Sequence, residues 1–518
     1  MSGDIIQGRN VEGDLELRAQ VCIVGSGAGG AVVAKTLSEA GLDVIVIEEG
    51  GHTPPEVYGK YRPTQTLRNL AREGGTAVTM ALGDSPLIAI LQGRTVGGSS
   101  VLTGGVCFRI PESVTSRWAT EHGLPGFSER ELEACYSDVE REVHVETVPE
   151  HMRSKSTVLF GEGMKKLGYG MKPLRRNTKG CCGCSRCNFG CPHQAKLSVD
   201  LTYLKKALQH GTRIYSDCRA DELLIENGRA AGVVGRLVDG PTGNTRGKFR
   251  VRAETVVVCA GSLHTPLLLM RSGLGKRSEV LGRRLTLHPA SRVAAFFDTE
   301  VKGWQGALQS TYCDDLEDEG ITFTSVFAPL NILAAAVPGV GSAHHERIRK
   351  MGQLAVFGVM VHDQGGGSIY KGFGREPFVT YRMAKEDKHK LFRGVKIAAE
   401  AFFAAGAREV LLPFYGFEPV KSVDELRALD PRTVPARLGE CAAFHPLGSA
   451  RMGTDAYHGV VDPNGQSFDV EGLYVADGSL FPTSIGVNSQ LPIMTVATRI
   501  AWGLREKLAT KAPVSVAS

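Results

Sequence analysis

A glycine-rich turn near the N-terminus constrains the fold of this chain more than any other feature. An apolar run ends in Gly25-Ser-Gly27-Ala-Gly-Gly30, and a stretch of helical composition follows over 31–40. A second apolar run, 43–48, completes the pattern. Strand, glycine turn, helix and strand in this order predict a βαβ unit in a Rossmann-like α/β fold with parallel strands.

The spacing of these glycines is typical of a turn that binds the pyrophosphate of a dinucleotide. Gly25 permits the tight turn, Gly27 lets the pyrophosphate approach the backbone, and Gly30 lets the helix pack against the strand. Glu48 ends the second apolar run and can accept hydrogen bonds from a ribose, which favours FAD or NAD over NADP. The turn by itself does not separate FAD from NAD. A glycine-rich turn without a ligand would leave this acidic residue unexplained.

The length of 518 residues predicts two domains or one large split domain. Apolar runs that stop at glycine or aspartate recur at 254–261 and 471–477, so the nucleotide-binding domain draws on distant parts of the chain. Between 291 and 440, segments of alternating apolar and polar residues and a strong helix candidate predict an inserted domain of antiparallel sheet and helix, which would bind the substrate. We assign 15–125, 198–290 and 441–510 to the nucleotide-binding domain, 291–440 to the substrate-binding domain, and 126–197 to a basic, cysteine-rich linking segment.

Charge and hydropathy argue against several classes of partner. A net charge of +5 gives no reason to expect nucleic acid. The longest uncharged stretch, 320–343, is interrupted by Pro329, Asn331 and Pro338 and does not predict a membrane span. The first residues are polar and of mixed charge, unlike a secretory signal, so we expect a cytoplasmic protein with reduced thiols.

Five cysteines lie within one short segment, at Cys181, Cys182, Cys184, Cys187 and Cys191. From Cys181 the pattern is C-x2-C-x2-C-x3-C-P, the spacing of bacterial ferredoxins, which predicts an iron–sulfur cluster. Residues 153–196 hold ten Lys or Arg against one acidic residue, an excess that offsets thiolate charge or attracts an acidic electron acceptor. Structural thiols and a zinc site are the alternatives, although compact zinc sites usually draw ligands from two separated pairs.

Four further segments carry recognisable patterns. They are Gly93-Arg-Thr-Val-Gly97-Gly98-Ser99-Ser100, Cys259-Ala-Gly261-Ser-Leu-His-Thr-Pro266, His445-Pro-Leu-Gly448-Ser-Ala-Arg-Met-Gly453, and the stretch from Gly472 through Asp477 to Asn488. In this order, and with the glycine turn, they resemble the glucose–methanol–choline (GMC) family of oxidoreductases. The resemblance implies FAD as cofactor and the oxidation of a small-molecule alcohol to a carbonyl compound.

The resemblance assigns the catalytic step to His445 and Asn488. Removing a hydride from a carbinol carbon requires that the hydroxyl proton leaves too, and an imidazole with a pKa of about 6.5 is mostly neutral near pH 7. His445 is therefore the expected base, and Asn488 is expected to hold the substrate oxygen through its N–H group. The expected FAD-binding residues are Gly25, Gly27, Gly30, Glu48, Gly97, Gly98, Ser99, Gly261 and Asp477.

Two departures from the family pattern concern the flavin. Thr103 stands where the family usually has an asparagine, which removes one expected contact. Members that link FAD covalently carry a histidine in this stretch, whereas no histidine lies between Gly97 and Arg109. We therefore expect FAD to be bound non-covalently.

The cysteine-rich segment resembles two subgroups of the family, the iron–sulfur sugar dehydrogenases and the long-chain fatty alcohol oxidases. If the uncharged stretch 321–343 lines the site rather than the core, the substrate is a long-chain or aryl alcohol. An iron–sulfur-assisted sugar or polyol dehydrogenase is the first alternative, and an FAD-containing lyase on the same scaffold is the second. The sequence leaves oxygen, a quinone or a redox protein open as the electron acceptor.

Overall fold

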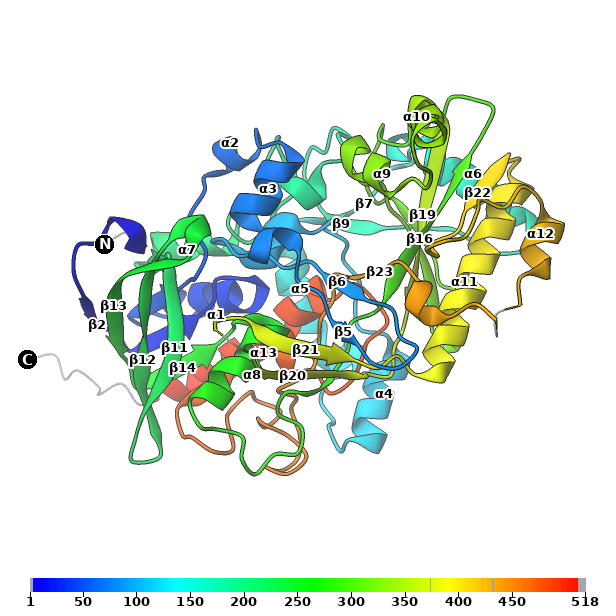
Figure 1. The fold of residues 1–518 in the computed structure, drawn as a ribbon. Helices are drawn as coiled ribbons and strands as arrows, with labels where there is room; N and C mark the ends of the chain where they lie inside the picture. Colours follow the sequence, from blue (N-terminus) through cyan, green and yellow to red (C-terminus); the bar gives the residue numbers. More distant parts are fainter. Residues whose placement is uncertain (1–2, 373, 431–432, 511–518) are drawn as a thin grey trace, which may run out of the picture.

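The computed structural model describes residues 3–372, 374–430 and 433–510 (Figure 1). Its central element is a parallel sheet whose inner strands are buried on both faces, as expected for continuous apolar runs. In spatial order these strands are β1 (Ile5–Gln7), β10 (Arg213–Ser216), β4 (Val44–Ile47), β3 (Val21–Val24), β14 (Thr255–Val258) and β24 (Leu473–Val475). Strands from both ends of the chain therefore meet in one sheet, and the predicted Rossmann-like fold is confirmed.

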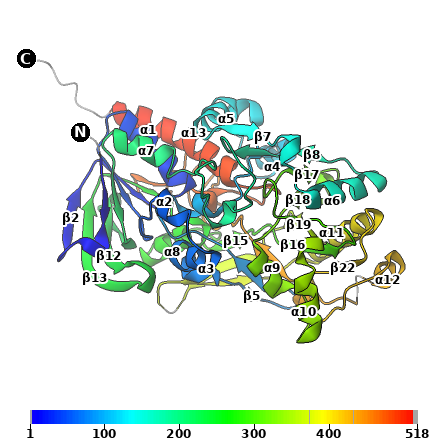
Figure 2. The same ribbon diagram turned by 90° about the horizontal axis from the view of Figure 1, so that it is seen from above.

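Helices from distant parts of the chain pack beside this sheet. The helix after the glycine turn, α1 (Ala28–Glu39), lies against α13 (Gln490–Ala509) and α7 (Tyr203–Gln209), and α13 also contacts α5 (Glu129–Glu142) (Figure 2). A Cβ on Gly29 of α1 would lie 1.8 Å from the carbonyl oxygen of Ala476, because the helix packs directly on the end of β24. The C-terminal helix thus belongs to the nucleotide-binding part of the molecule.

A smaller four-stranded sheet covers part of the parallel sheet. Its strands are β11 (Cys218–Glu226), β12 (Arg229–Asp239), β13 (Asn244–Arg252) and β2 (Leu15–Arg18). β12 contacts β14, and β11 contacts β4. Helix α8 (Gly261–Arg271) begins just after β14 and packs against β11.

The second large sheet is mostly antiparallel. Its strands in order are β6 (Ile88–Ile90), β23 (Cys441–Ala443), β16 (Ala290–Phe296), β19 (Leu354–Val361), β18 (Ile321–Ser325), β17 (Thr311–Cys313) and β8 (Lys172–Pro173), and β22 (Glu409–Leu411) also pairs with β16. Three of them, β6, β8 and β23, come from outside the predicted inserted domain. The domain boundaries stay a prediction.

The two faces of this sheet have different surroundings. Helices α6 (Lys155–Lys166) and α11 (Lys385–Ala404) pack on one face. Along β19 the side chains alternate, so that Ala355 and Phe357 join the core under these helices, while Val356, Gly358 and Met360 line a cavity on the other face. The antiparallel sheet and strong helix predicted within 291–440 are therefore present, and the sheet forms one wall of the cavity.

The remaining elements are short. Strands β15 (Arg283–Leu285), β20 (Gly367–Lys371), β21 (Pro377–Tyr381) and β5 (Met80–Ala81) form one sheet, and β7 (Val145–Thr147) pairs with β9 (Arg175–Asn177). The other helices are α2 (Pro55–Tyr58), α3 (Pro63–Leu70), α4 (Glu112–Glu121), α9 (Leu330–Ala336), α10 (Ser342–Arg349) and α12 (Val423–Ala428). Within the described ranges, no helix is both long and apolar enough to cross a membrane.

Candidate active site

One cavity of about 870 Å³ joins the two halves of the fold. It is lined by the glycine turn and by the eight-stranded sheet, so a ligand inside it contacts both. Of the sequence-predicted site residues, those that line it are Gly25, Gly27, Glu48, Gly98, Ser99, Gly261, His445, Asp477 and Asn488. Gly30, Gly97 and the five cysteines are not among its lining residues.

The glycine turn leaves its backbone open toward this cavity. Gly25 has a φ of 102°, a left-handed conformation that side chains disfavour. A Cβ on Gly30 would lie 1.9 Å from the carbonyl oxygen of Gly25, so this glycine allows the helix to pack on the turn. A Cβ on Gly27 would meet only Cα of Gly98, at 3.9 Å, and the side of Gly27 therefore faces open space.

A chain of hydrogen bonds connects Glu48 to the second glycine pair. Oε2 of Glu48 accepts from the N–H (3.0 Å) and hydroxyl (2.7 Å) of Ser26, and Oε1 accepts from Gly50 N–H (2.8 Å). The hydroxyl of Ser26 in turn accepts from Gly97 N–H at 3.0 Å. Burial raises the pKa of Glu48 above its usual value, against these hydrogen bonds. Ser26, which sequence reasoning did not select, thus fixes the two loops relative to each other.

Asp477 lines the same cavity and binds the backbone of two segments. Its Oδ2 accepts a hydrogen bond from Gly261 N–H at 2.7 Å, and its Oδ1 accepts from Ser479 N–H at 2.8 Å. Burial raises the pKa of Asp477 despite these bonds. Because the carboxylate follows β24 and Gly261 begins α8, the contact ties the C-terminal part of the chain to the helix after β14.

His445 and Asn488 meet inside the cavity, although they come from different loops. Nδ2 of Asn488 lies 3.0 Å from Nε2 of His445. Among the described residues, His445 Nδ1 and Asn488 Oδ1 are buried and have no hydrogen-bond partner. Burial lowers the pKa of His445 to about 4, so its imidazole is neutral near pH 7. The pair offers a neutral imidazole and an amide donor side by side.

A second histidine holds the loop that carries Asn488. Nε2 of His288 accepts hydrogen bonds from the N–H groups of Ile485 and Gly486, each at 3.2 Å, and the His288 ring lies 5.6 Å from that of His445. Burial keeps the pKa of His288 well below its ordinary value, so Nε2 keeps its lone pair. His288 is not among the site residues predicted from the sequence. Its contact with the 485–486 backbone is a tertiary feature that no local pattern reveals.

One side of the cavity, formed by α9, the segment before it and part of β19, is largely apolar. Its residues include Val326, Phe327, Ala328, Ile332, Leu333, Val356 and Met360. Part of the uncharged stretch 321–343 therefore lines the cavity. Four further lining residues, Val78, Leu87, Tyr415 and Phe444, are exposed to solvent and mark the cavity's opening.

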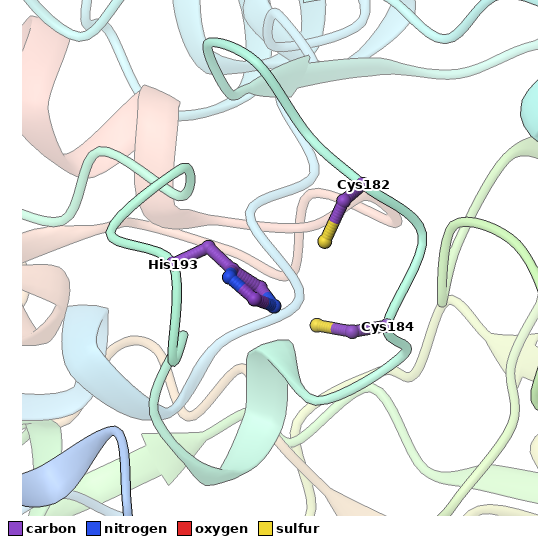
Figure 3. Close-up of side chains that lie close together, drawn as sticks. All are labelled: Cys182, Cys184 and His193. Atoms are coloured by element: carbon purple, nitrogen blue, oxygen red, sulfur yellow. The ribbon is translucent and has the colours of Figure 1, made fainter.

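The cysteine-rich loop surrounds a second, small cavity of about 10 Å³. All five predicted cysteines line it, and so does His193. The ligand atoms of Cys182, Cys184 and His193 lie within 4.8 Å of one another, and Figure 3 shows the three side chains pointing toward one point. Sequence reasoning missed His193, which follows the Cys191-Pro pair directly.

Comparisons with known proteins identify the family. Two family models described as GMC oxidoreductase match residues 37–290 and 376–497. The chain belongs to the GMC oxidoreductases. The predicted resemblance is thereby confirmed, and with it an oxidoreductase that acts on CH–OH groups and uses FAD.

Relatives of this GMC oxidoreductase come from bacteria and plants. It is 39% identical to a GMC-type oxidoreductase of Mycobacterium tuberculosis, over 93% of this chain and 75% of that protein. It is 34% identical to one of Sinorhizobium fredii, over 95% and 96%. A long-chain-alcohol oxidase of Arabidopsis thaliana is 29% identical, over 96% and 69%.

Solved structures share the fold of this GMC oxidoreductase. Pyridoxine 4-oxidase from Mesorbium loti matches with a TM-score of 0.72 at 18% identity, over 94% of this chain and 99% of that chain. Formate oxidase from Aspergillus oryzae matches with a TM-score of 0.73 at 16% identity, over 95% and 99%. At these sequence identities the matches show a shared fold and nothing about the reaction.

Proposed function

We propose that this GMC oxidoreductase oxidises long-chain or aryl alcohols to carbonyl compounds, with His445 as the base. The observation that carries the proposal is that His445 and Asn488 share one cavity with an apolar wall. The long-chain-alcohol oxidase among the relatives supports the same substrate class.

The residues around the glycine turn fit the dinucleotide part of FAD. A side chain on Gly27 would enter the cavity, and its absence leaves a cradle of backbone N–H groups at the start of α1. Glu48 faces the same cavity and can accept hydrogen bonds from a ribose. Bound FAD supplies the acceptor for the hydride that leaves the carbinol carbon.

The catalytic roles follow from the state of His445. Its imidazole is neutral, and the lone pair on Nε2 accepts from the amide of Asn488 until a substrate hydroxyl takes the place of that amide. Nε2 would take the proton of the substrate hydroxyl, while Nδ2 of Asn488 would donate to the substrate oxygen and hold it in place. Asn488 cannot ionise, so it positions the oxygen and leaves the proton to His445.

The apolar wall favours a hydrocarbon substrate over a sugar. Burying a hydrocarbon against side chains such as Phe327 and Ile332 is worth about 25 cal/mol per Å² of apolar surface. A polyol hydroxyl placed against these apolar side chains would lack a hydrogen-bond partner, and each unpaired group costs about 1–3 kcal/mol. The exposed apolar residues at the opening extend the same surface toward solvent.

We propose non-covalent FAD for a structural reason as well. Between 97 and 109 the residues that line the cavity are Gly98, Ser99, Ser100, Leu102, Thr103, Gly104, Gly105 and Val106. None of these carries a side chain that forms a stable bond to a flavin ring. Acid precipitation of the purified protein should release the flavin into the supernatant, and flavin in the pellet would refute this point.

The substrate class is tested by anaerobic mixing of the purified holoenzyme with 1-dodecanol, benzyl alcohol, glucose or sorbitol. The flavin absorbance near 450 nm should bleach with the first two and persist with the sugars. Bleaching by glucose alone would replace this proposal by the sugar dehydrogenase alternative. Conversion of an added cyanohydrin without any bleaching would replace it by the lyase alternative.

The iron–sulfur variant of the function stays a prediction. In its favour, five cysteines line one cavity. An enzyme of that kind should contain iron with matching acid-labile sulfide and pass electrons to a one-electron acceptor. Metal and sulfide analysis of the same sample decides it.

A further inference from the structure

Within the cysteine-rich loop, five residues between 180 and 194 have a left-handed backbone. Gly180, Gly183 and Gly190 have positive φ angles, and so do Ser185 (52°) and Gln194 (53°), which carry side chains. A non-glycine residue in this conformation is strained and persists only where tertiary contacts hold it. Here Ser185 donates a hydrogen bond to the carbonyl of Gly306 at 2.8 Å. The turns of this loop bring its five cysteines and His193 around one small cavity.

We propose that this loop binds a single zinc ion through Cys182, Cys184 and His193, with a fourth ligand from another thiol of the same cavity. The three ligand atoms lie within 4.8 Å of one another (Figure 3). A tetrahedral zinc with bonds of 2.0–2.3 Å holds its sulfur and nitrogen ligands about 3.5–3.8 Å apart. Rotation of exposed side chains closes that difference, since Cys182 and His193 are exposed.

The remaining cysteines supply the fourth position. Cys181, Cys187 and Cys191 line the same cavity of about 10 Å³. A cavity of this volume holds about one water molecule or one ion. Three thiolates and one imidazole form a common closed structural zinc set. The proposed ion therefore stabilises the loop and leaves no position for a substrate.

Two buried cationic side chains, Arg176 and Lys196, lie beside the small cavity and require compensating negative charge. Arg176, almost fully buried, donates to the Gly104 carbonyl and, at 2.9 Å, to Sγ of Cys187. Lys196 is equally buried and donates to the carbonyls of Ser100, Val101, Thr103 and Cys187. None of these partners is a carboxylate. Because buried charges require compensation, a zinc site with three thiolates and one neutral imidazole, whose net charge is negative, offsets part of this positive charge.

The geometry favours one ion over an iron–sulfur cluster. Thiolates that bind different irons of a cluster point outward from it and lie farther apart than the ligands of one ion. The ligand atoms of Cys182, Cys184 and His193 all lie within 4.8 Å of one another, a spacing that suits the ligands of one ion, and the group includes a histidine. Borderline-soft Zn²⁺ accepts both thiolate and imidazole without redox chemistry.

The site also connects to the main cavity. Lys196 donates hydrogen bonds to backbone carbonyls between 100 and 103, shortly after Gly97-Gly98. Asn188 and Phe189, which belong to the cysteine-rich loop, line the large cavity. Metal loss should therefore loosen a wall of the FAD-binding region without removing any group that acts on the alcohol.

The test is elemental analysis of the purified holoprotein from zinc- and iron-supplemented cultures, combined with zinc-edge X-ray absorption. About one zinc per chain with sulfur and nitrogen neighbours is expected. His193→Ala and Cys184→Ser should each lose most of this zinc, whereas His345→Ala, a change at a histidine of exposed α10, should keep it.

Three outcomes would overturn the proposal. They are protein without zinc, protein with iron and equal acid-labile sulfide, and full zinc occupancy in the His193→Ala variant. Flavin reduction by alcohol is recorded on the same samples. An enzyme that contains no zinc and still reduces its flavin with alcohol would refute the metal site and would not contradict the proposed function.

Discussion

The amide nitrogen of Asn488 lies 3.0 Å from Nε2 of His445, although the two residues enter the cavity from separate loops. His445 follows β23, and Asn488 directly precedes α13. An amide nitrogen only donates, so Nε2 must be the unprotonated acceptor. The contact thus keeps Nε2 of His445 unprotonated, and its lone pair becomes free for a substrate hydroxyl when the Asn488 amide donates to the substrate oxygen instead.

The low pKa of His445 predicts an unusual pH profile. A base works only when neutral, and burial lowers this pKa to about 4. Protonation on the acid side removes the base, so kcat/KM should stay level down to about pH 5 and fall as the pH drops through about 4. The flavin spectrum at each pH verifies that the cofactor stays bound. An acid limb near 6.5, the value of an ordinary histidine, would contradict the burial of this ring.

Substitution of Asn488 should affect the rate and the pH profile differently. Asn488→Ala removes one hydrogen bond, worth about 1–1.5 kcal/mol, and should slow flavin reduction about tenfold. Asn488→Asp places a carboxylate against the imidazole, which raises the pKa of His445 and should move the acid limb to higher pH. Asn464→Asp, on the exposed surface, should leave the limb in place. An unmoved limb in Asn488→Asp would show that the two side chains do not interact in solution.

Gly27→Val should abolish flavin retention. Its side chain would occupy the open space beside the turn, where the pyrophosphate is expected to lie. The measurement is the ratio of flavin to protein absorbance after gel filtration. Gly503→Val serves as control, because Gly503 is an exposed position of α13 and a Cβ there meets nothing within 4 Å. Normal flavin content in Gly27→Val would move the dinucleotide site elsewhere.

Ile332→Asn should weaken the binding of apolar alcohols. Ile332 lines the cavity, whereas Leu330 on the same helix is exposed and does not. Losing about 1–2 kcal/mol of apolar contact should raise KM for 1-dodecanol about tenfold with kcat nearly unchanged. Leu330→Asn should match the parent. Equal KM values for all three proteins would show that helix α9 does not contact the substrate.

The sequence predicts local elements of this fold better than their pairing. The apolar runs around Val21–Val24, Val44–Ile47 and Thr255–Val258 are strands because continuous apolar segments need burial on both faces. The pairing of β6 and β8 into the eight-stranded sheet was not predicted. Both strands are two or three residues long, and only tertiary contacts select their partners.

For the candidate site, too, the sequence indicates individual residues better than the contacts between them. His445 and Asn488 were selected by resemblance to a family, not by any local signal that they would meet. Ser26 and Lys196 went unnoticed because their importance lies in hydrogen bonds to distant backbone. His193 lies beside a conspicuous cysteine run, yet only the turns of the loop bring it to Cys182 and Cys184.

The most direct test of the central claim is anaerobic stopped-flow reduction of the flavin by 1-dodecanol in the parent and in His445→Ala. Because a positioned general base contributes about 10²–10⁴-fold, the variant should reduce its flavin slower by that factor while it retains FAD. His345→Ala, on exposed α10, should reduce at the parent rate. A His445→Ala variant that reduces its flavin as fast as the parent would contradict the assignment of His445 as the base.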